Sequence, residues 1–259
     1  GPRPPRSNPA RRLEPPSPSA MRIDLSELAE AFPDFRVGVM VATGLAVPAE
    51  RADALDRLIA ERAAAVRAAW GGRELGDIPG IKVWRLAYKS FGIKSTRYRC
   101  SVERLVKNVL AEREAPRING FVDAYNAVSA THVFPIGADD LDRVTGDVFF
   151  RRARPTDTFV DMAGGDDADP SDAAPKPDEV VYTDAEKVLC RRWNWRQDAR
   201  SLVQPTSRRV ILTIQSLGVG DLDAALADVC ALTERFCGGR TAVTVADARD
   251  PVKDVAIPA

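Results

Sequence analysis

The chain has 259 residues, and its 37 lysines and arginines are balanced by 37 aspartates and glutamates, so its formal net charge is zero. This length is sufficient for one large domain or two smaller ones, and the composition, 45% hydrophobic and 29% charged, is typical of a globular protein. The charge balance excludes a polybasic protein, and a single histidine with four cysteines that form no CxxC pair leads us to expect no metal and no other cofactor.

Residues 1–20 contain seven prolines, four arginines and no apolar stretch, which excludes a signal peptide or a membrane anchor in this segment. Such a segment cannot bury enough surface to fold, so we expect an unstructured, vector-derived tail before a natural start at Met21. A basic arm that contacts RNA is the alternative. The isolated cysteines indicate reduced thiols, and we expect a cytoplasmic protein without membrane contact.

The first half of the chain predicts both strands and helices. Alternating valines predict a strand over residues 35–43, and apolar residues at helical spacing predict a helix from Pro48 to Trp70. A second amphipathic helix is predicted over residues 101–112, with a short strand at 148–150.

The second half continues this mixed pattern after residues 163–177, whose Gly, Asp, Pro and Ala composition predicts a surface loop without EF-hand spacing. Three strands, a helix and a last strand are predicted at 180–182, 188–195, 209–214, 221–236 and 241–245. No repeat or linker interrupts residues 21–250. We therefore expect one α/β domain in which helices flank a mixed β-sheet, followed by a tail at 251–259.

Charge is unevenly distributed along the chain. Eight cations between Lys82 and Lys107 are opposed only by Glu103, and a second arginine-rich segment covers residues 191–209. If residues 188–195 form a strand, Trp193 and Trp195 share one face. Arginine beside aromatic side chains suits the ends of single-stranded nucleic acids, through phosphate pairing and base stacking. The alternative is that the tryptophans lie in the core and the arginines form a solvated face.

Few catalytic motifs are available to this chain. A Ser or Cys triad would need His132, which has no nucleophile elbow around it, so we interpret it as structural. Neither a P-loop nor a GxGxxG motif occurs. Residues 118–126 and 135–141 combine Asn, Asp and Gly, which can hold a water or a carbonyl by neutral hydrogen bonds. Each of these residues also fits an Asx-capped turn.

Four motifs in a fixed order resemble one family, the editing or tRNA-binding domain of the phenylalanyl-tRNA synthetase β subunit, here in a free-standing form. The resemblance is strongest over residues 75–235. The motifs are Trp84-Arg85-x-x-Tyr88-Lys89-x-Phe91-Gly92-x-Lys94, then Asn119 and Val122-Asp123-x-Tyr125-Asn126, then Pro135-x-Gly137-x-x-Asp140, and Leu189-Cys190-Arg191-Arg192-Trp193-Asn194-Trp195-Arg196.

The resemblance implies an enzyme that acts in trans on the aminoacylated 3′ end of tRNA and hydrolyses a mischarged ester with a positioned water. It implies a catalytic role for Asn126, Gly137, Asp140 and Gln215. Gly137 stands where the synthetase has a histidine, and Gln215 falls near its pocket glutamate. Two alternatives therefore stay open: a tRNA- or RNA-binding module without catalysis, and an aminoacyl-tRNA-dependent transferase. The expected substrate- and tRNA-binding residues are Arg85, Tyr88, Lys89, Lys94, Asn119, Arg192, Trp193, Asn194, Trp195 and Arg196.

Overall fold

The structure is a computed structural model that describes residues 21–162 and 173–259. The predicted tail at 1–20, and the aspartates of the predicted surface loop, lie outside the described residues. The described part is a single mixed α and β domain, which confirms the expected fold class, but its strands form two sheets where we expected one.

The first sheet is antiparallel, and its long strand β2 (Phe35–Thr43) is buried on both faces. Val37, Val39 and Val41 point toward the second sheet, while Met40 and Ala42 point toward helices. This two-sided burial explains why the segment is apolar at almost every position. In spatial order the sheet contains β3 (Ile136–Asp140), β8 (Val210–Leu217), β2 and β9 (Arg240–Asp247).

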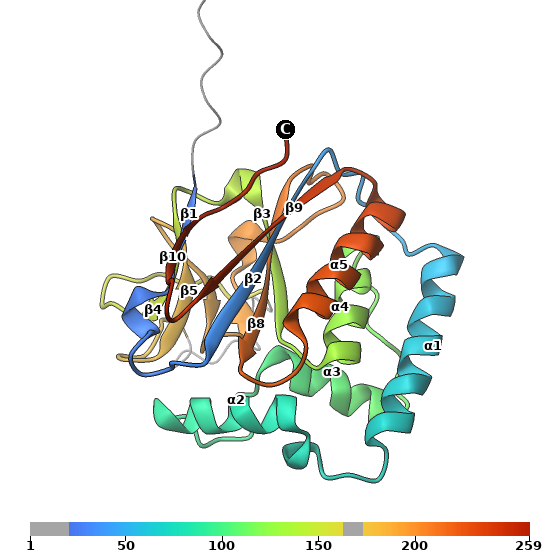
Figure 1. Ribbon diagram of the computed structural model, residues 1–259, viewed down its shortest axis with the longest axis horizontal. Helices are drawn as coiled ribbons and strands as arrows, with labels where there is room; N and C mark the ends of the chain where they lie inside the picture. The colour runs from blue at the N-terminus through green and yellow to red at the C-terminus, as the bar shows by residue number, and fades with distance from the viewer. Residues whose placement is uncertain (1–20, 163–172) are drawn as a thin grey trace, which may run out of the picture.

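Helices cover the face of this sheet that lies away from the second sheet (Figure 1). Helices α4 (Gly120–His132) and α5 (Leu222–Cys237) pack on the sheet, and α1 (Asp53–Trp70) packs on α4. Asn119 begins α4 as its N-cap, because its side-chain oxygen accepts hydrogen bonds from the main-chain N–H groups of Phe121 and Val122 at 3.1 and 2.9 Å. The cap fixes the direction in which α4 presents its side chains.

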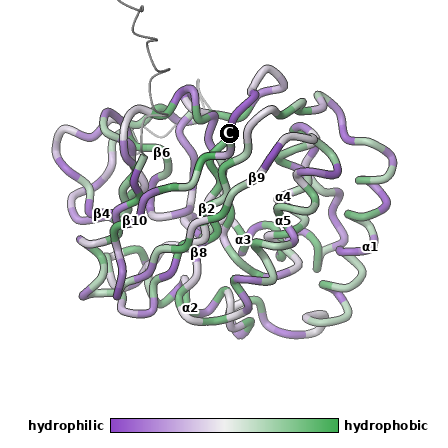
Figure 2. Tube along the Cα trace, turned by 45° about the horizontal axis from the view of Figure 1, so that its top comes forward, coloured by the Kyte–Doolittle hydropathy of each residue, from purple (hydrophilic) through white to green (hydrophobic). Residues whose placement is uncertain are grey.

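The second sheet packs on the opposite face of the first, and the core between them includes Phe150, Tyr182 and Trp193. Figure 2 shows hydrophobic colour along β2 and β8 and hydrophilic colour in many peripheral loops. The spatial order is β10 (Val252–Asp254), β1 (Arg22–Asp24), β4 (Val148–Arg152), β5 (Val180–Thr183), β6 (Val188–Arg191) and β7 (Arg196–Gln197), with only β1 and β4 parallel.

Helices α2 (Pro79–Ser90) and α3 (Ser101–Leu110) lie at one end of the layers (Figure 1). Four single-turn 3₁₀ helices complete the described elements: Ser26–Leu28, Leu75–Asp77, Leu141–Arg143 and Ala199–Ser201.

Three predictions need correction. The predicted strand over 188–195 ends at Arg191, because Arg192 and Trp193 adopt left-handed backbone angles, φ 44° and 64°, in a turn that leads to β7. Trp193 and Trp195 therefore do not share a strand face. The segment 251–259 is not simply a tail, since β10 pairs with β1. The helix predicted from Pro48 begins only at Asp53.

Candidate active site

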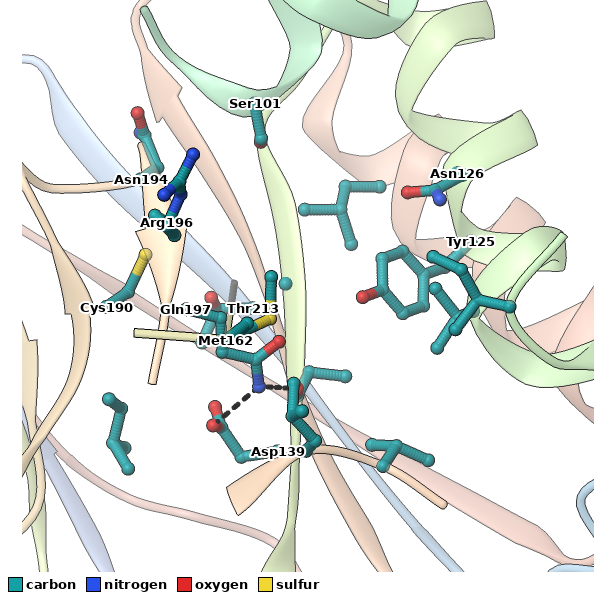
Figure 3. Close-up of a pocket in the computed structure, with 18 of the residues that line it drawn as sticks. Ser101, Tyr125, Asn126, Asp139, Met162, Cys190, Asn194, Arg196, Gln197 and Thr213 are labelled. Carbon is teal, nitrogen blue, oxygen red and sulfur yellow. Dashed lines mark hydrogen bonds between the residues drawn. The ribbon is translucent and has the colours of Figure 1, made fainter. Parts of the chain in front are cut away.

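A cavity of about 480 Å³ lies between helix α4, strand β3 and the turn from β6 to β7, with the start of α3 at one side (Figure 3). Its walls are mainly apolar, and the polar groups among them are neutral amides and hydroxyls apart from Asp139, Arg104 and Arg196. A concave, largely apolar site with few polar groups is the usual form of a small-molecule pocket.

Asp139 is the buried acid of this cavity, and its side chain comes from the edge strand β3. Its Oδ1 accepts hydrogen bonds from Ser201 Oγ at 2.6 Å and from Gln197 Nε2 at 2.9 Å. Burial raises the pKa of Asp139 to about 7, against the effect of these two hydrogen bonds, which lower it. The carboxyl group therefore keeps its proton to a much higher pH than an exposed aspartate does.

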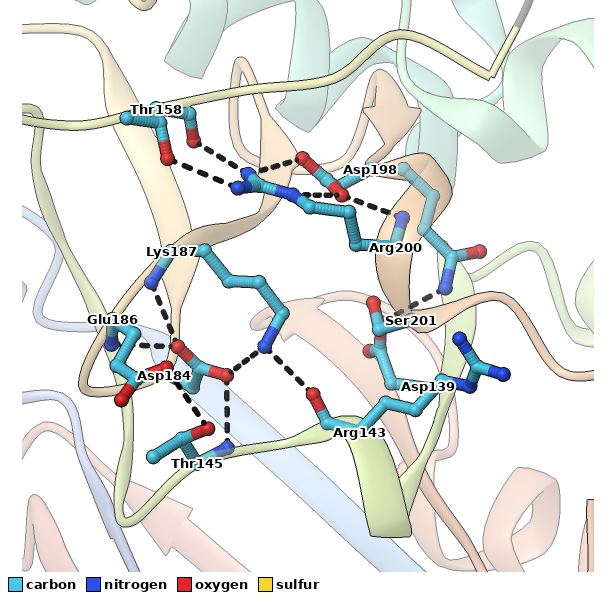
Figure 4. A network of polar contacts seen from close by, with 11 residues as sticks. Asp139, Arg143, Thr145, Thr158, Asp184, Glu186, Lys187, Asp198, Arg200 and Ser201 are labelled. Carbon is cyan, nitrogen blue, oxygen red and sulfur yellow. Dashed lines mark hydrogen bonds and ion pairs between the residues drawn. The ribbon is translucent and has the colours of Figure 1, made fainter.

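Asp139 differs from every other buried carboxylate in residues 21–162 and 173–259, because no cation lies within ion-pair distance of it. Figure 4 shows two paired acids nearby, Asp184 with Lys187 and Asp198 with Arg200. The remaining pairs are Glu103 with Arg85, Asp123 with Arg51, Asp140 with Arg143 and Glu179 with Arg191. An unpaired buried acid in a pocket is a common feature of functional sites.

A chain of hydrogen bonds orients Gln215 in the wall of the cavity. The Tyr88 hydroxyl donates to Asn194 Oδ1 at 2.7 Å, and Asn194 Nδ2 donates to Gln215 Oε1 at 3.0 Å. Gln215 Nε2 in turn donates to Thr213 Oγ1 at 3.3 Å. Tyr88 is 1% exposed, so it positions Asn194 from the core and cannot contact RNA as the sequence had led us to expect.

Tyr125 and Asn126 project from α4 toward the cavity (Figure 3). The Asn126 amide has no hydrogen-bond partner among the described residues, so it can bind a ligand without breaking an existing contact. Burial raises the pKa of Tyr125, and its hydroxyl therefore stays protonated at neutral pH and can donate a hydrogen bond.

Gly137 leaves room in the cavity, because a Cβ atom placed on it would meet nothing within 4 Å. Gln215 N donates to Pro135 O at 3.1 Å, and Leu141 N donates to Arg209 O at 3.0 Å, so every second residue from 135 to 141 bonds to the chain of β8. By the antiparallel alternation, the main-chain groups of Gly137 face β8 and those of Ala138 face the open edge. The Ala138 N–H therefore points away from β8, where it donates a hydrogen bond to the Tyr125 hydroxyl.

Seven of the predicted site residues line this cavity: Asn119, Asn126, Gly137, Asn194, Trp195, Arg196 and Gln215. Asp140 does not line it. Its carboxylate accepts hydrogen bonds from Ser207 Oγ at 2.7 Å and from Asp142 N at 3.0 Å, which begins a 3₁₀ turn. Asp140 is thus structural in this fold, and its neighbour Asp139 occupies the place expected of it.

Five more of the expected RNA-binding residues do not line the cavity: two are buried, and three lie on α2 or just after it. Trp193 is fully buried, with its ring centroid 5.0 Å from that of Trp84, so a ligand cannot stack on it. Arg192 is also buried, over the ring of Tyr98 at 3.6 Å. Arg85 pairs with the buried Glu103, and the exposed Lys89 and Lys94 lie at the end of α2 and just after it, away from the cavity walls.

The predicted site residues did not include the cavity residues Asp139, Tyr125 and Gln197, although the first two lie in the segments 118–126 and 135–141 that the sequence indicated. The signal for Asp139 was present as two adjacent aspartates, but choosing between them needs the β3 register. His132 lies outside the cavity, where its Nε2 contacts Asp228 Oδ2 at 2.8 Å, in keeping with a structural histidine.

The fold and this cavity define a two-sheet α and β domain with a ligand-sized pocket at its centre. The sequence model described as the B3/4 domain matches residues 83–219, more than half of the chain, and the chain belongs to this family. All seven predicted residues that line the cavity lie inside the matched segment, as does Asp139. The match supports the relation to the phenylalanyl-tRNA synthetase β subunit that the motifs indicated.

Among solved structures, the chain is similar to an N-terminal fragment of the phenylalanyl-tRNA synthetase β subunit from Pyrococcus horikoshii, with 11% sequence identity and a TM-score of 0.38. The similarity covers 85% of this chain and 50% of that chain, so this chain spans about half of its length. The comparison with curated proteins gives no match.

Within residues 21–162 and 173–259, no helix combines the length and apolar character needed to cross a membrane. Within the same ranges, no three His, Cys, Asp or Glu side chains are grouped so that they could hold a metal ion.

Proposed function

We propose that this chain hydrolyses the ester of mischarged aminoacyl-tRNA in trans, in the cavity between α4, β3 and β7. The observation that supports this most directly is Asp139, an unpaired buried carboxyl group in a cavity whose other groups are mostly neutral. An aminoacyl ester is already activated, so its hydrolysis needs a positioned water and a proton acceptor more than a strong nucleophile. A carboxyl group with a pKa of about 7 can both accept and return a proton at neutral pH.

In the proposed reaction, a water oxygen bonds to the ester carbonyl carbon while its proton passes to Asp139, directly or through one further water. The bond from that carbon to the ribose oxygen then breaks, and Asp139 returns the proton to the ribose oxygen. The products are a free amino acid and an uncharged tRNA. No oxidant or metal is consumed in this balance.

The charge that develops on the carbonyl oxygen needs hydrogen-bond donors fixed in advance. The Asn126 amide faces the cavity and supplies one such donor, and the Tyr125 hydroxyl, which accepts from the Ala138 N–H, can supply a second. Gln215, held by Asn194, is uncharged where the synthetase family has a glutamate, so the carboxylate in this chain is supplied from β3 instead.

A second hydrolytic site improves fidelity because a hydrophobic synthesis pocket separates near-isosteric amino acids poorly. We place the partner tRNA with its acceptor end at the cavity. The four cysteines are free thiols in the structure, and burial raises the pKa of Cys100 to about 12, so that thiol is unreactive. Such thiols fit the reducing cytoplasm that we propose as the location.

The test is release of free amino acid from a panel of aminoacyl-tRNAs at pH 7. Wild-type protein should deacylate at least one mischarged tRNA faster than the spontaneous rate, and Asp139→Asn should lose most of this activity while still binding tRNA. Asp142→Asn is the matched control, because Asp142 is an exposed carboxylate on Arg209 outside the cavity. If no charged tRNA is deacylated above background, the hydrolase proposal is wrong.

The two alternatives give different products in the same assay. A transferase should leave the amino acid attached to a new acceptor, and only when that acceptor is supplied. A binding module should retain the charged tRNA and slow its spontaneous hydrolysis. Full activity in Asn126→Ala would remove Asn126 from the set of oxyanion donors.

A further inference from the structure

A second hollow, of about 460 Å³, lies along helix α3 and the loop before it, and we call it the α3 groove. A single carboxylate, Glu103, faces it, and its other lining residues besides the cations are Leu75, Thr96 and Asn108. The cations that line it are Arg85, Arg97, Arg99, Arg104, Lys107 and Arg113. No comparable excess of one charge occurs in the central cavity.

Half of the six cations in the groove have no carboxylate partner among the described residues. Glu103 is buried and already holds Arg85 at 3.0 Å and Arg99 at 3.7 Å. Arg104, Lys107 and Arg113 have no carboxylate within 4 Å in the part of the chain that the structure describes. Exposed cations elsewhere are of both kinds: Arg22 pairs with Asp254 and Arg154 with Glu27, whereas other arginines of the described ranges, such as Arg57 and Arg249, have no such partner. The groove differs because it gathers three unpaired cations in one hollow.

The groove adjoins the central cavity. Arg104 lines both hollows, and Lys107 follows it by three residues on the same face of α3. Tyr98, between two arginines of the groove, packs its ring edge-on against Trp195 of the cavity, with centroids 5.0 Å apart. An extended anion bound in the groove can therefore reach the cavity at Arg104, and Glu103 is the one carboxylate among the described residues that line its path through the groove.

We infer that the α3 groove binds the phosphodiester backbone of the unpaired 3′ strand of an RNA whose terminal residue enters the cavity. The assignment of that RNA to aminoacyl-tRNA rests on the proposed function, whereas binding of the backbone does not require hydrolysis. Lysine and arginine side chains neutralise successive phosphates and release counterions. The groove is concave and has Leu75 as its one apolar lining residue, which disfavours a membrane surface or a peptide anchored by apolar side chains.

The test measures fluorescence anisotropy of a labelled single-stranded RNA 12-mer ending in CCA, titrated with the full chain over a range of salt concentrations. The double variant Arg104→Glu/Lys107→Glu should bind at least tenfold more weakly. Its salt slope should fall by roughly 1.4, since each lost contact to a single strand accounts for about 0.7. Arg57→Glu is the control for each of the two reversals, because it makes the same charge change as one of them, at an exposed position of α1 that lines neither hollow. Circular dichroism establishes that all variants are folded, and Arg104→Gln/Lys107→Gln replaces the glutamate pair if that pair unfolds.

Unchanged affinity and salt slope in a folded double variant would overturn the inference, as would an equal loss in Arg57→Glu. Competition by a polyglutamate peptide as strong as that by unlabelled RNA would assign the groove to acidic peptides and equally overturn it. Groove-dependent RNA binding without any deacylation supports the groove and refutes the hydrolase. Deacylation that is intact in the double variant at subsaturating tRNA supports the hydrolase and refutes the groove.

Discussion

Asp139→Asn should change how the stability of the protein depends on pH. The Asp139 carboxyl has a pKa of about 7 in the folded protein and the ordinary value of 3.8 when unfolded. Well below pH 4 the carboxyl group is protonated in both the folded and the unfolded state, so its burial does not lower the stability. As the pH rises from about 4 to about 7, only the unfolded chain releases the proton, so the stability of the folded state falls. Three pKa units at about 1.4 kcal/mol each amount to about 4 kcal/mol over this window.

Asparagine at this position has no proton to release, and its side-chain oxygen can still accept from Ser201 and Gln197. The variant should therefore gain stability relative to wild type, progressively from pH 4 to 7, by up to about 4 kcal/mol. A constant offset of about 1–3 kcal/mol is expected from the extra buried N–H₂ group, so the slope and not the absolute difference is diagnostic. Urea unfolding at half-unit steps from pH 4 to 8 measures it, with Asp142→Asn as control. Parallel curves for wild type and Asp139→Asn would refute the assignment.

Three further predictions concern other parts of the fold. Trp193→Ala should lower the free energy of unfolding by about 3–5 kcal/mol in urea, while the RNA affinity of the folded protein stays unchanged, because this ring is core. Gly137→Val should fold normally, since its Cβ meets open space, but should reduce kcat/KM for deacylation at least tenfold by filling the cavity. Burial acts to raise the pKa of Asp228, but Arg62 and His132 hold it well below its usual range, so Arg62→Met should destabilise by about 1–3 kcal/mol at pH 7. That loss should shrink as the pH falls below about 4, because the unfolded chain then binds a proton that Asp228 in folded wild type does not, as thermal melts at pH 7 and 3 can measure.

The periodicity of the sequence was sufficient to predict an element correctly where one burial pattern runs along the whole element. The strand predicted over 35–43 has the bounds of β2, since its alternating valines all point toward the second sheet. Helix α4 escaped prediction because it is buried on nearly every side, so Gly120–His132 shows no polar face from which helical spacing could be read.

Contacts with residues elsewhere in the chain determine the structure of the segments that were predicted wrongly. Glu179, twelve residues before Arg191, accepts hydrogen bonds from the Arg191 side chain and from the Arg192 main chain, and Val180 O accepts from Trp193 N at 2.6 Å. These bonds hold the turn that ends β6 and send Trp193 into the core. Local alternation carries no information about such partners. It also cannot distinguish Asp139 from Asp140, because the register of β3 against β8 decides which of the two side chains lines the cavity.

Two basic runs in the sequence looked equally suited to RNA, and the structure separates them by what each cation already contacts. In the run from 191 to 209, the arginines mostly have acidic partners inside the fold: Arg191 with Glu179, Arg196 with Asp161, Arg200 with Asp198 and Arg209 with Asp142. A phosphate could bind these four arginines only by displacing a carboxylate, and for the buried Arg191 pair this would leave an uncompensated charge. In the α3 groove, Arg104, Lys107 and Arg113 have no carboxylate within 4 Å among the described residues, so phosphate binding to them breaks no ion pair. The zero net charge thus conceals one neutralised arginine cluster and one available groove, and the available groove is the one that opens onto the cavity.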